Sequence, residues 1–162
     1  MTLRRNVRVA DLVTGKGEGT LSALGLGSCV AIVLYDSTTR AGGMAHVLLP
    51  SAPPRVGEFH VPGRYAQSAV PALLDAVLAL GASRAALTAR IAGGASMFSN
   101  LVAPGLIHTG ERNVLSTREA LHSRGIPITG EWVGGDFGRT VVFDLATGRV
   151  TASSVRQGAR EL

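Results

Sequence analysis

The apolar positions in the N-terminal half of the chain occur in short runs that have no helical period. Residues 20–25 and 29–35 are filled by β-branched and apolar residues, and a glycine-containing gap separates them. A third run, residues 44–50, begins after two glycines and stops at Pro50. This pattern predicts three strands.

Two later stretches have the spacing of amphipathic helices. Residues 64–80 place their apolar side chains on one stripe, and a glycine follows as a suitable C-terminal residue. Pro71 either lies in the first turn of this helix or kinks a longer one. The second predicted helix covers about residues 110–124, and a glycine again follows it.

Short strands and turns account for much of the remaining chain. The pattern predicts a strand over 84–94 that leads into a glycine turn, and a meander with strands near 128–133, 139–145 and 149–155. Residues 50–63 are rich in proline and predict an irregular loop. Two helices among about seven strands, with consecutive antiparallel pairs, favour an α+β sandwich over a doubly wound parallel sheet.

Composition is typical of one globular domain. The chain has 162 residues, 46% of them hydrophobic and 17% charged, which is enough to bury a core without disulfides or metals. A single cysteine forms no intramolecular disulfide, and no apolar run resembles a signal peptide or a membrane span. We expect residues 1–162 to form one domain in a reducing cytoplasm, without membrane insertion and with no diagnostic pattern in residues 1–19.

The net charge of +5 permits an acidic partner, but the arginines are scattered and aromatic residues make up only 4% of the chain. Nucleic-acid binding is therefore not favoured. No nucleotide-binding glycine motif is present, and one cysteine with four dispersed histidines lacks the ligand spacing of zinc. The sequence predicts neither a metal nor a cofactor.

Cys29 is either a small core residue or a nucleophile, and a nucleophile needs a base or a positive charge beside it. If the chain reverses at Ser37 and Thr38, Cys29 and His46 lie directly opposite each other on neighbouring strands. A bulge at Gly42 or Gly43 would instead move His46 to the other face. His46 could also be a core histidine that is bonded to a backbone carbonyl.

The other histidines are weaker candidates for the base. His60, in the proline-rich loop, is the second choice, whereas His108 and His122 are interpreted as surface or capping residues near the second helix. The glycines before Cys29 allow a tight turn, and such a turn can aim successive N–H groups at one point. Backbone groups of Gly27, Ser28 and Val30 are therefore candidates for an oxyanion hole.

Six blocks of the sequence resemble those of a known family. The blocks "LGLGSCVAIVLYD", "GGMAHVLLP", "GRYAQSAVPALL", "RIAGGASMF", "TGERNV" and "VGGDFGRTVVFDLATGRV" occur in this order over most of the chain. This set resembles the CheD family, the chemoreceptor glutamine deamidases of bacterial chemotaxis. The combination of G-S-C with G-G-M-A-H is the specific part of the resemblance.

The resemblance implies a layered α/β fold related to cytotoxic cysteine deamidase toxins, with a nucleophile at Cys29 and a base at His46. It also implies a catalytic threonine six positions before the cysteine, where this chain has Ala23. Thr20 and Ser22 lie nearby, but in an extended strand they point to the face opposite Ala23. The orientation of the histidine, or the rate, is therefore expected to differ from the family pattern.

The same resemblance implies a substrate and partners. The enzyme would convert receptor glutamines to glutamate, and hydrolysis of a glutamyl methyl ester is the same chemistry with another leaving group. Arg55, His60 and Arg64 offer cationic side chains for a glutamate-rich receptor. The alternative is a binding module with little turnover that acts on receptors or on a CheC-type phosphatase.

Overall fold

The structure is a computed structural model that describes residues 2–54, 61–98 and 107–162. Its helices are α1 (Ala66–Ala79) and α2 (Thr109–His122), with short 3-10 turns at Pro62–Arg64 and Arg84–Ala86. Its strands are β1 (Arg4–Asn6), β2 (Leu12–Lys16), β3 (Thr20–Leu26), β4 (Val30–Asp36), β5 (Ala41–Val47), β6 (Thr88–Gly93), β7 (Ile128–Val133), β8 (Arg139–Asp144), β9 (Val150–Ser154) and β10 (Gly158–Glu161). Both predicted helices are confirmed, and Pro71 lies inside α1 rather than in its first turn.

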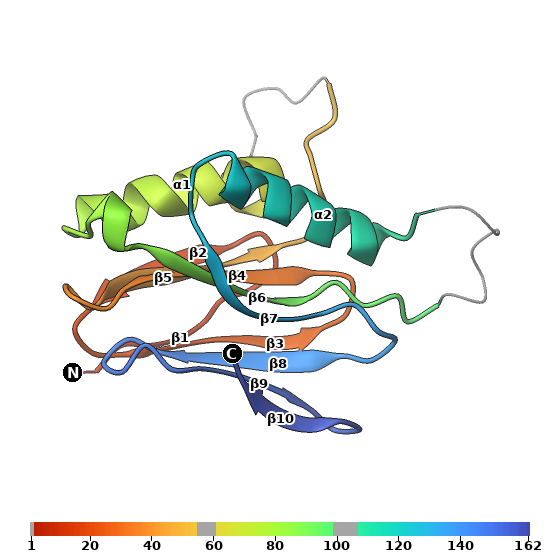
Figure 1. The fold of residues 1–162 in the computed structure, drawn as a ribbon. Coiled ribbons are helices and arrows are strands. Elements are labelled where there is room, and N and C mark those ends of the chain that lie inside the picture. Colours follow the sequence, from red (N-terminus) through yellow and green to blue (C-terminus); the bar gives the residue numbers. More distant parts are fainter. Residues whose placement is uncertain (1, 55–60, 99–106) are drawn as a thin grey trace.

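These elements form three layers (Figure 1). Helices α1 and α2 lie on one face of a five-stranded sheet with the order β2-β5-β4-β6-β7, here called the covered sheet. A second five-stranded sheet, β1-β3-β8-β9-β10, lies on its other face and is called the outer sheet. The predicted α+β sandwich is confirmed.

Strand β4 lies at the centre of the covered sheet and separates two apolar cores. Its even positions, such as Ile32, belong to the core beneath the helices, and its odd positions, such as Val33, belong to the core between the sheets. Burial on both faces explains why this strand is a continuous apolar run. Met44 of β5 also belongs to the core between the sheets, so His46, two residues further on, faces the same side.

The predicted strand pattern was wrong in three places, two in pairing and one in a strand boundary. Strands β3 and β4 are consecutive but belong to different sheets, and β7 pairs in parallel with β6 instead of opening a meander. The strand predicted over 84–94 begins later, as β6, after a 3-10 turn. The N-terminal residues, for which no pattern was found, supply β1 and β2 at one edge of each sheet.

The β4–β5 hairpin also has a different register from the predicted one. Ala31 lies opposite His46, and Val30 lies opposite Val47, because the connection is a four-residue turn over 37–40. Continuing this register places Leu48, not His46, opposite Cys29. The shift is two residues, and an even shift keeps both side chains on the face that was predicted for them.

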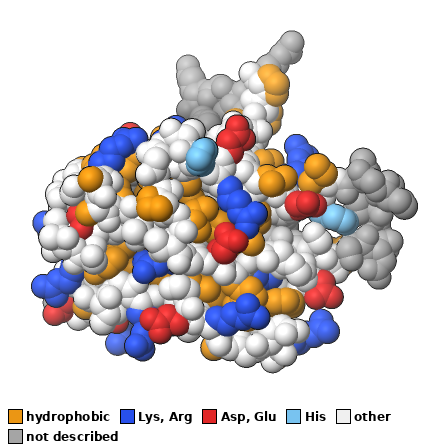
Figure 2. All heavy atoms as spheres, in the orientation of Figure 1, with side chains coloured by type: hydrophobic (Ala, Val, Ile, Leu, Met, Phe, Trp, Pro, Cys, Tyr) orange, Lys and Arg blue, Asp and Glu red, His pale blue; other side chains and the backbone are white. Residues whose placement is uncertain are grey.

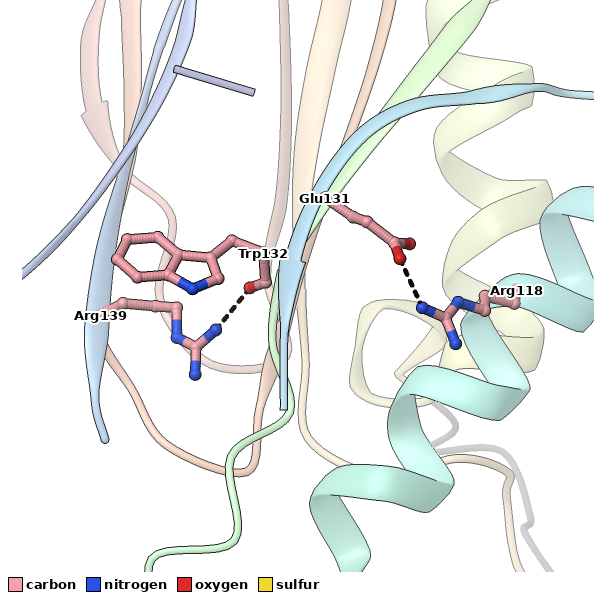
Figure 3. Close-up of polar contacts among 4 residues, drawn as sticks. All are labelled: Arg118, Glu131, Trp132 and Arg139. Carbon is pink, nitrogen blue, oxygen red and sulfur yellow. Dashed lines mark hydrogen bonds and ion pairs between the residues drawn. The ribbon is translucent and has the colours of Figure 1, made fainter. Parts of the chain in front are cut away.

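Strand β7 is tied to both neighbouring layers (Figure 3). The Arg118 guanidinium on α2 forms an ion pair with Glu131 on β7 at 2.6 Å. On the other side, Arg139 of β8 donates to the Trp132 carbonyl at 2.6 Å and to the carbonyls of Gly134 and Phe137. Arg139 is only 2% exposed, so this buried guanidinium holds the connection between β7 and β8 against the outer sheet.

In the described part of the chain, no helix is both long and apolar enough to cross a bilayer.

Candidate active site

Cys29 lies where the chain passes from one sheet to the other. Strand β3 ends at Leu26 in the outer sheet, and β4 begins at Val30 in the covered sheet. The three residues between them, Gly27, Ser28 and Cys29, are called the Cys29 corner. The Cys29 side chain is half-buried and packs against the core between the sheets, on the side that His46 faces.

The carbonyls of the Cys29 corner are all hydrogen-bonded. Ala95 N–H donates to Gly27 O at 2.8 Å, the Asn113 side-chain amide donates to Ser28 O at 2.8 Å, and Gly94 N–H donates to Cys29 O at 2.8 Å. The N–H groups of the same three residues donate to no other described residue, although the Cys29 N–H interacts with its own sulfur. Three consecutive free N–H groups in a turn form the kind of concavity that binds an anion or oxyanion.

Two glycines explain why the Cys29 N–H is free. In a regular antiparallel ladder, the residue that accepts from Gly94 would also donate back to the Gly94 carbonyl. Gly93 and Gly94 have φ values of 112° and 68°, which end the ladder. The Gly94 carbonyl instead lies against α2, where a Cβ added to Gly110 would be 2.6 Å from its oxygen. The glycine turn that the sequence predicts at the end of this strand agrees with this geometry.

His46 is almost fully buried, at 4% exposure, and is oriented by the N-terminal segment. Its Nδ1 lies 2.9 Å from the backbone oxygen of Val7. Because a carbonyl oxygen only accepts, Nδ1 carries a proton, and Nε2 is the basic atom of the neutral ring. Burial lowers the pKa of His46 below 6.5, and the bond to Val7 opposes this more weakly. His46 is therefore neutral at pH 7.

Cys29 and His46 share a face as diagonal neighbours, which typically lie about 7–8 Å apart at Cα. The structure has no hydrogen bond between these two described side chains. Burial raises the pKa of the Cys29 thiol above 9.0, and its own N–H lowers it by less. A reactive cysteine beside a base is expected to have a thiol pKa below its free value, and the direction found here is the opposite. The pair is a neutral thiol beside a neutral imidazole, which suits general-base activation during attack.

Ala23 is fully buried in the core between the sheets, with Leu21 on the same face. Thr20 and Ser22 are half-buried and alternate with these two residues, as the sequence predicts. The register of β3 against β8 shifts only after Ala23, so the irregularity does not turn Ser22 toward the interior. No hydroxyl of β3 thus replaces the threonine that the family resemblance implies.

The remaining predicted residues have different outcomes. Val30 lies inside the covered sheet between Val47 and Gly93, so we place the candidate oxyanion donors at the Cys29 corner instead. Arg64 is exposed, and its backbone carbonyl accepts from Leu48 and Leu49, directly after the His46 strand. Arg55 and His60 lie outside the described residues.

Two contributors to the site had no assigned role in the sequence. The Val7 carbonyl orients His46, and a backbone carbonyl has no residue signature. Asn113 is fully buried on α2 and donates to Ser28 O. Its position on the same helical face as Val114 and Leu121 could have indicated that it is buried. The sequence pattern could not have identified its hydrogen-bond partners.

An open hollow lies near the corner but is not lined by its three residues or by His46. This hollow, of about 330 Å³, begins at Gly25 and Met97 and runs along Phe137 and Val155. Met97 is half-exposed, and its sulfur would lie 3.2 Å from a Cβ at Gly27. Among the described residues, no three His, Cys, Asp or Glu side chains are grouped to hold a metal ion.

Comparison with known proteins assigns the family. Residues 48–154 match the CheD family, described as CheD chemotactic sensory transduction. A Pyrococcus abyssi protein named probable chemoreceptor glutamine deamidase CheD is 44% identical over 98% of this chain and 96% of its own length. A protein of the same name from Pyrococcus horikoshii is 43% identical over 94% of this chain and 93% of its own length.

A third relative, from Halalkalibacterium halodurans, is named chemoreceptor glutamine deamidase CheD and is 41% identical over 96% of each chain. These alignments extend well beyond residues 48–154, over nearly the whole chain, which includes the segment that carries Cys29 and His46. From the family match and the near full-length similarity to these relatives, we conclude that this chain belongs to the CheD family.

Proposed function

We propose that this chain is a hydrolase that deamidates glutamine side chains in the cytoplasmic domains of chemoreceptors, in the cytoplasm and as part of chemotactic adaptation. The names of its relatives support this substrate. The observation that carries the chemistry is the Cys29 corner, where a half-buried thiol lies beside three free N–H groups and on the face of a neutral histidine.

The first half-reaction forms a thioester. His46 Nε2 accepts the thiol proton while Cys29 Sγ attacks the carboxamide carbon of the glutamine. The N–H groups of Gly27, Ser28 and Cys29 stabilise the oxyanion of the tetrahedral intermediate. Its C–N bond then breaks, and the His46 imidazolium donates its proton to the departing nitrogen, so that ammonia leaves.

The second half-reaction regenerates the enzyme. A water molecule attacks the thioester carbon as His46 Nε2 accepts its proton, and the same N–H groups hold the second oxyanion. The C–S bond breaks, the sulfur regains a proton from His46, and the product is a glutamate side chain. A glutamyl methyl ester would follow the same steps with methanol as the leaving group.

Ammonia release from a recombinant receptor cytoplasmic fragment tests this proposal. We expect release by the unaltered protein, none by Cys29→Ala, and an unchanged rate for His122→Ala, which alters a histidine on α2 away from the Cys29 corner. Full activity of Cys29→Ala would contradict the nucleophile. Tight binding of the fragment with no release by any form would favour the adaptor alternative, for which a CheC-type phosphatase is a candidate partner.

A further inference from the structure

Asn113 joins the two segments that carry the proposed catalytic pair. Its side-chain amide nitrogen donates to Ser28 O at 2.8 Å and to Leu48 O at 2.9 Å. Ser28 directly precedes Cys29, and Leu48 follows His46 by two residues. The β4–β5 ladder ends at the pair Val30 and Val47, so the amide bridges the two chains where their own pairing stops.

The bond to Ser28 O also determines the direction of an N–H group. Ser28 C=O and Cys29 N–H belong to one planar trans peptide, in which these two bonds point in opposite directions. Asn113 lies on the helix side of the covered sheet, so holding Ser28 O there directs the Cys29 N–H toward the other side. Cys29 Sγ packs on that side, and the same N–H favours its thiolate.

The environment of Asn113 is unusual for a residue that only fills space. The side chain is 0% exposed, and its Oδ1 accepts no hydrogen bond within the described residues. Burial of an amide is unfavourable unless its hydrogen bonds compensate. Both compensating bonds here are made by the donor nitrogen, and both go to the backbone beside the proposed pair.

We propose that Asn113 is a positioning residue: by holding Ser28 O and Leu48 O, it fixes the Cys29 N–H as an oxyanion donor and keeps Cys29 aligned with His46. This inference rests on the proposed function. A donor to the carbonyl also polarises the peptide and strengthens its N–H as a donor. The effect therefore belongs to the transition state rather than to receptor binding.

Ser116 provides a matched control on the same helix. It is 8% exposed, and its hydroxyl donates to the Pro50 carbonyl at 2.9 Å, so it also ties α2 to the segment after β5. It does not contact the Cys29 corner. The experiment compares Asn113→Leu, which keeps the approximate size but removes both donors, with Ser116→Ala and with Cys29→Ala.

For each form, we would measure kcat and KM for deamidation of a receptor fragment, thermal unfolding, and the pH dependence of Cys29 alkylation by iodoacetamide. For Asn113→Leu we expect kcat to fall by about ten- to a hundredfold with little change in KM, and the alkylation profile to move to higher pH. Ser116→Ala should lose stability without either change.

Three results would overturn the inference. An Asn113→Leu protein with unchanged kcat and an unchanged alkylation profile, beside an inactive Cys29→Ala, would remove the positioning role alone. Full activity of Cys29→Ala would instead remove the proposed mechanism and this inference with it. If Asn113→Leu does not fold, nuclear magnetic resonance of the unaltered protein decides: the Asn113 amide signals should shift when Cys29 is alkylated, and unchanged signals would contradict the proposal.

Discussion

At the scale of single residues, the site is defined by the absence of charge. Burial disfavours both the thiolate of Cys29 and the imidazolium of His46. The resting pair is therefore neutral, and in the mechanism that we propose the proton moves only as the substrate is attacked. Asn113 and the Val7 carbonyl then matter because they fix directions, one for an N–H group and one for the imidazole ring.

The neutral pair predicts the acid limb of the activity profile. His46 must be unprotonated to act as the base, and its pKa is lowered from 6.5, so its charged form appears only below that pH. We expect kcat/KM to stay constant from pH 8 to about pH 6.5 and to fall in more acidic buffer. His46→Ala should remove activity across the whole range. A profile that falls already above pH 7 would point to a different base.

Ala23→Thr should raise turnover. A hydroxyl at this fully buried position would face the core between the sheets, on the side of His46, where the family resemblance implies a threonine. Because only catalytic geometry changes, kcat should rise while KM for a receptor fragment stays the same. Ser22→Thr, on the opposite face of β3, is the matched control. An unchanged rate for Ala23→Thr would mean that another group already orients His46.

At the scale of elements, the Cys29 corner depends on the ends of two strands. Strand β3 ends before it, and β6 ends beside it at Gly93 and Gly94. Both glycines adopt left-handed conformations, and a Cβ on Gly93 would overlap the Cys29 carbonyl oxygen. The corner thus keeps its shape because a neighbouring backbone can approach it without a side chain.

Gly93→Ala should therefore reduce both stability and activity. The control is Gly125→Ala, at another glycine of positive φ, 69° against 112° at Gly93, with nothing within 4 Å of its Cβ. We expect the control to lose about 1–2 kcal/mol of unfolding free energy and to retain its kcat. Gly93→Ala should lose more, and its kcat should fall as well. Equal behaviour of the two variants in denaturant titrations and turnover assays would show that the close approach is unimportant.

The opposite end of β4 carries a separate stabilising group, Asp36. Its fully buried carboxylate accepts from Ser83 N–H at 2.8 Å and Thr38 N–H at 2.9 Å, and these bonds lower its pKa below 3.8. Because the folded pKa is the lower one, its contribution is present above about pH 4 and is lost as the pH falls through the folded value.

Asp36→Asn should reduce the unfolding free energy at pH 7 by about 1–3 kcal/mol, since the stronger charged acceptor is lost. The difference between the variant and the unaltered protein should shrink in acid. Urea titrations at pH 7 and pH 3 measure both quantities. A difference that grows toward pH 3 would contradict the role of the Asp36 carboxylate.

The hairpin shows how far the sequence could lead. The face shared by Cys29 and His46 was predictable, because side chains alternate along a strand. A register shift of an even number of residues leaves each side chain on the same face of the sheet. The register itself was not, because the turn over 37–40 is set by Asp36 bonds to Thr38 and Ser83, and Ser83 is distant in sequence. The parallel pairing of β7 likewise depends on contacts between distant segments, such as the Ala89 N–H with the Pro127 carbonyl.

At the scale of the whole molecule, the proposed catalytic pair and its proposed positioning residue lie in different layers. The core between the sheets holds Cys29 and His46, whereas the helix layer holds Asn113. On the face drawn in Figure 2, basic and acidic side chains are interspersed. On this face the excess positive charge therefore acts on a partner as a diffuse attraction rather than as one binding patch.

This charge predicts salt-dependent association with a glutamate-rich receptor fragment. Exposed pairs contribute about 0–1 kcal/mol each, so they change the association rate more than the affinity. Arg64→Glu, at an exposed position whose backbone adjoins the His46 strand, should slow association and weaken its salt dependence. Stopped-flow measurements from low to high salt check this, with Arg156→Glu, at another exposed arginine, as the comparison. Association rates of the unaltered protein that do not change with salt concentration would exclude electrostatic steering.

The most direct measurement of the central claim is the mass of the enzyme during turnover. The protein and a receptor fragment are mixed, quenched in acid within the time of one turnover, and analysed intact and after digestion. We predict an adduct of the enzyme with the fragment, less one ammonia, that maps to Cys29 through a thioester to a receptor glutamine and is absent from Cys29→Ala. A Cys29→Ala protein that still converts the same glutamine to glutamate, at the rate of the unaltered protein and with no adduct in either, would contradict the account.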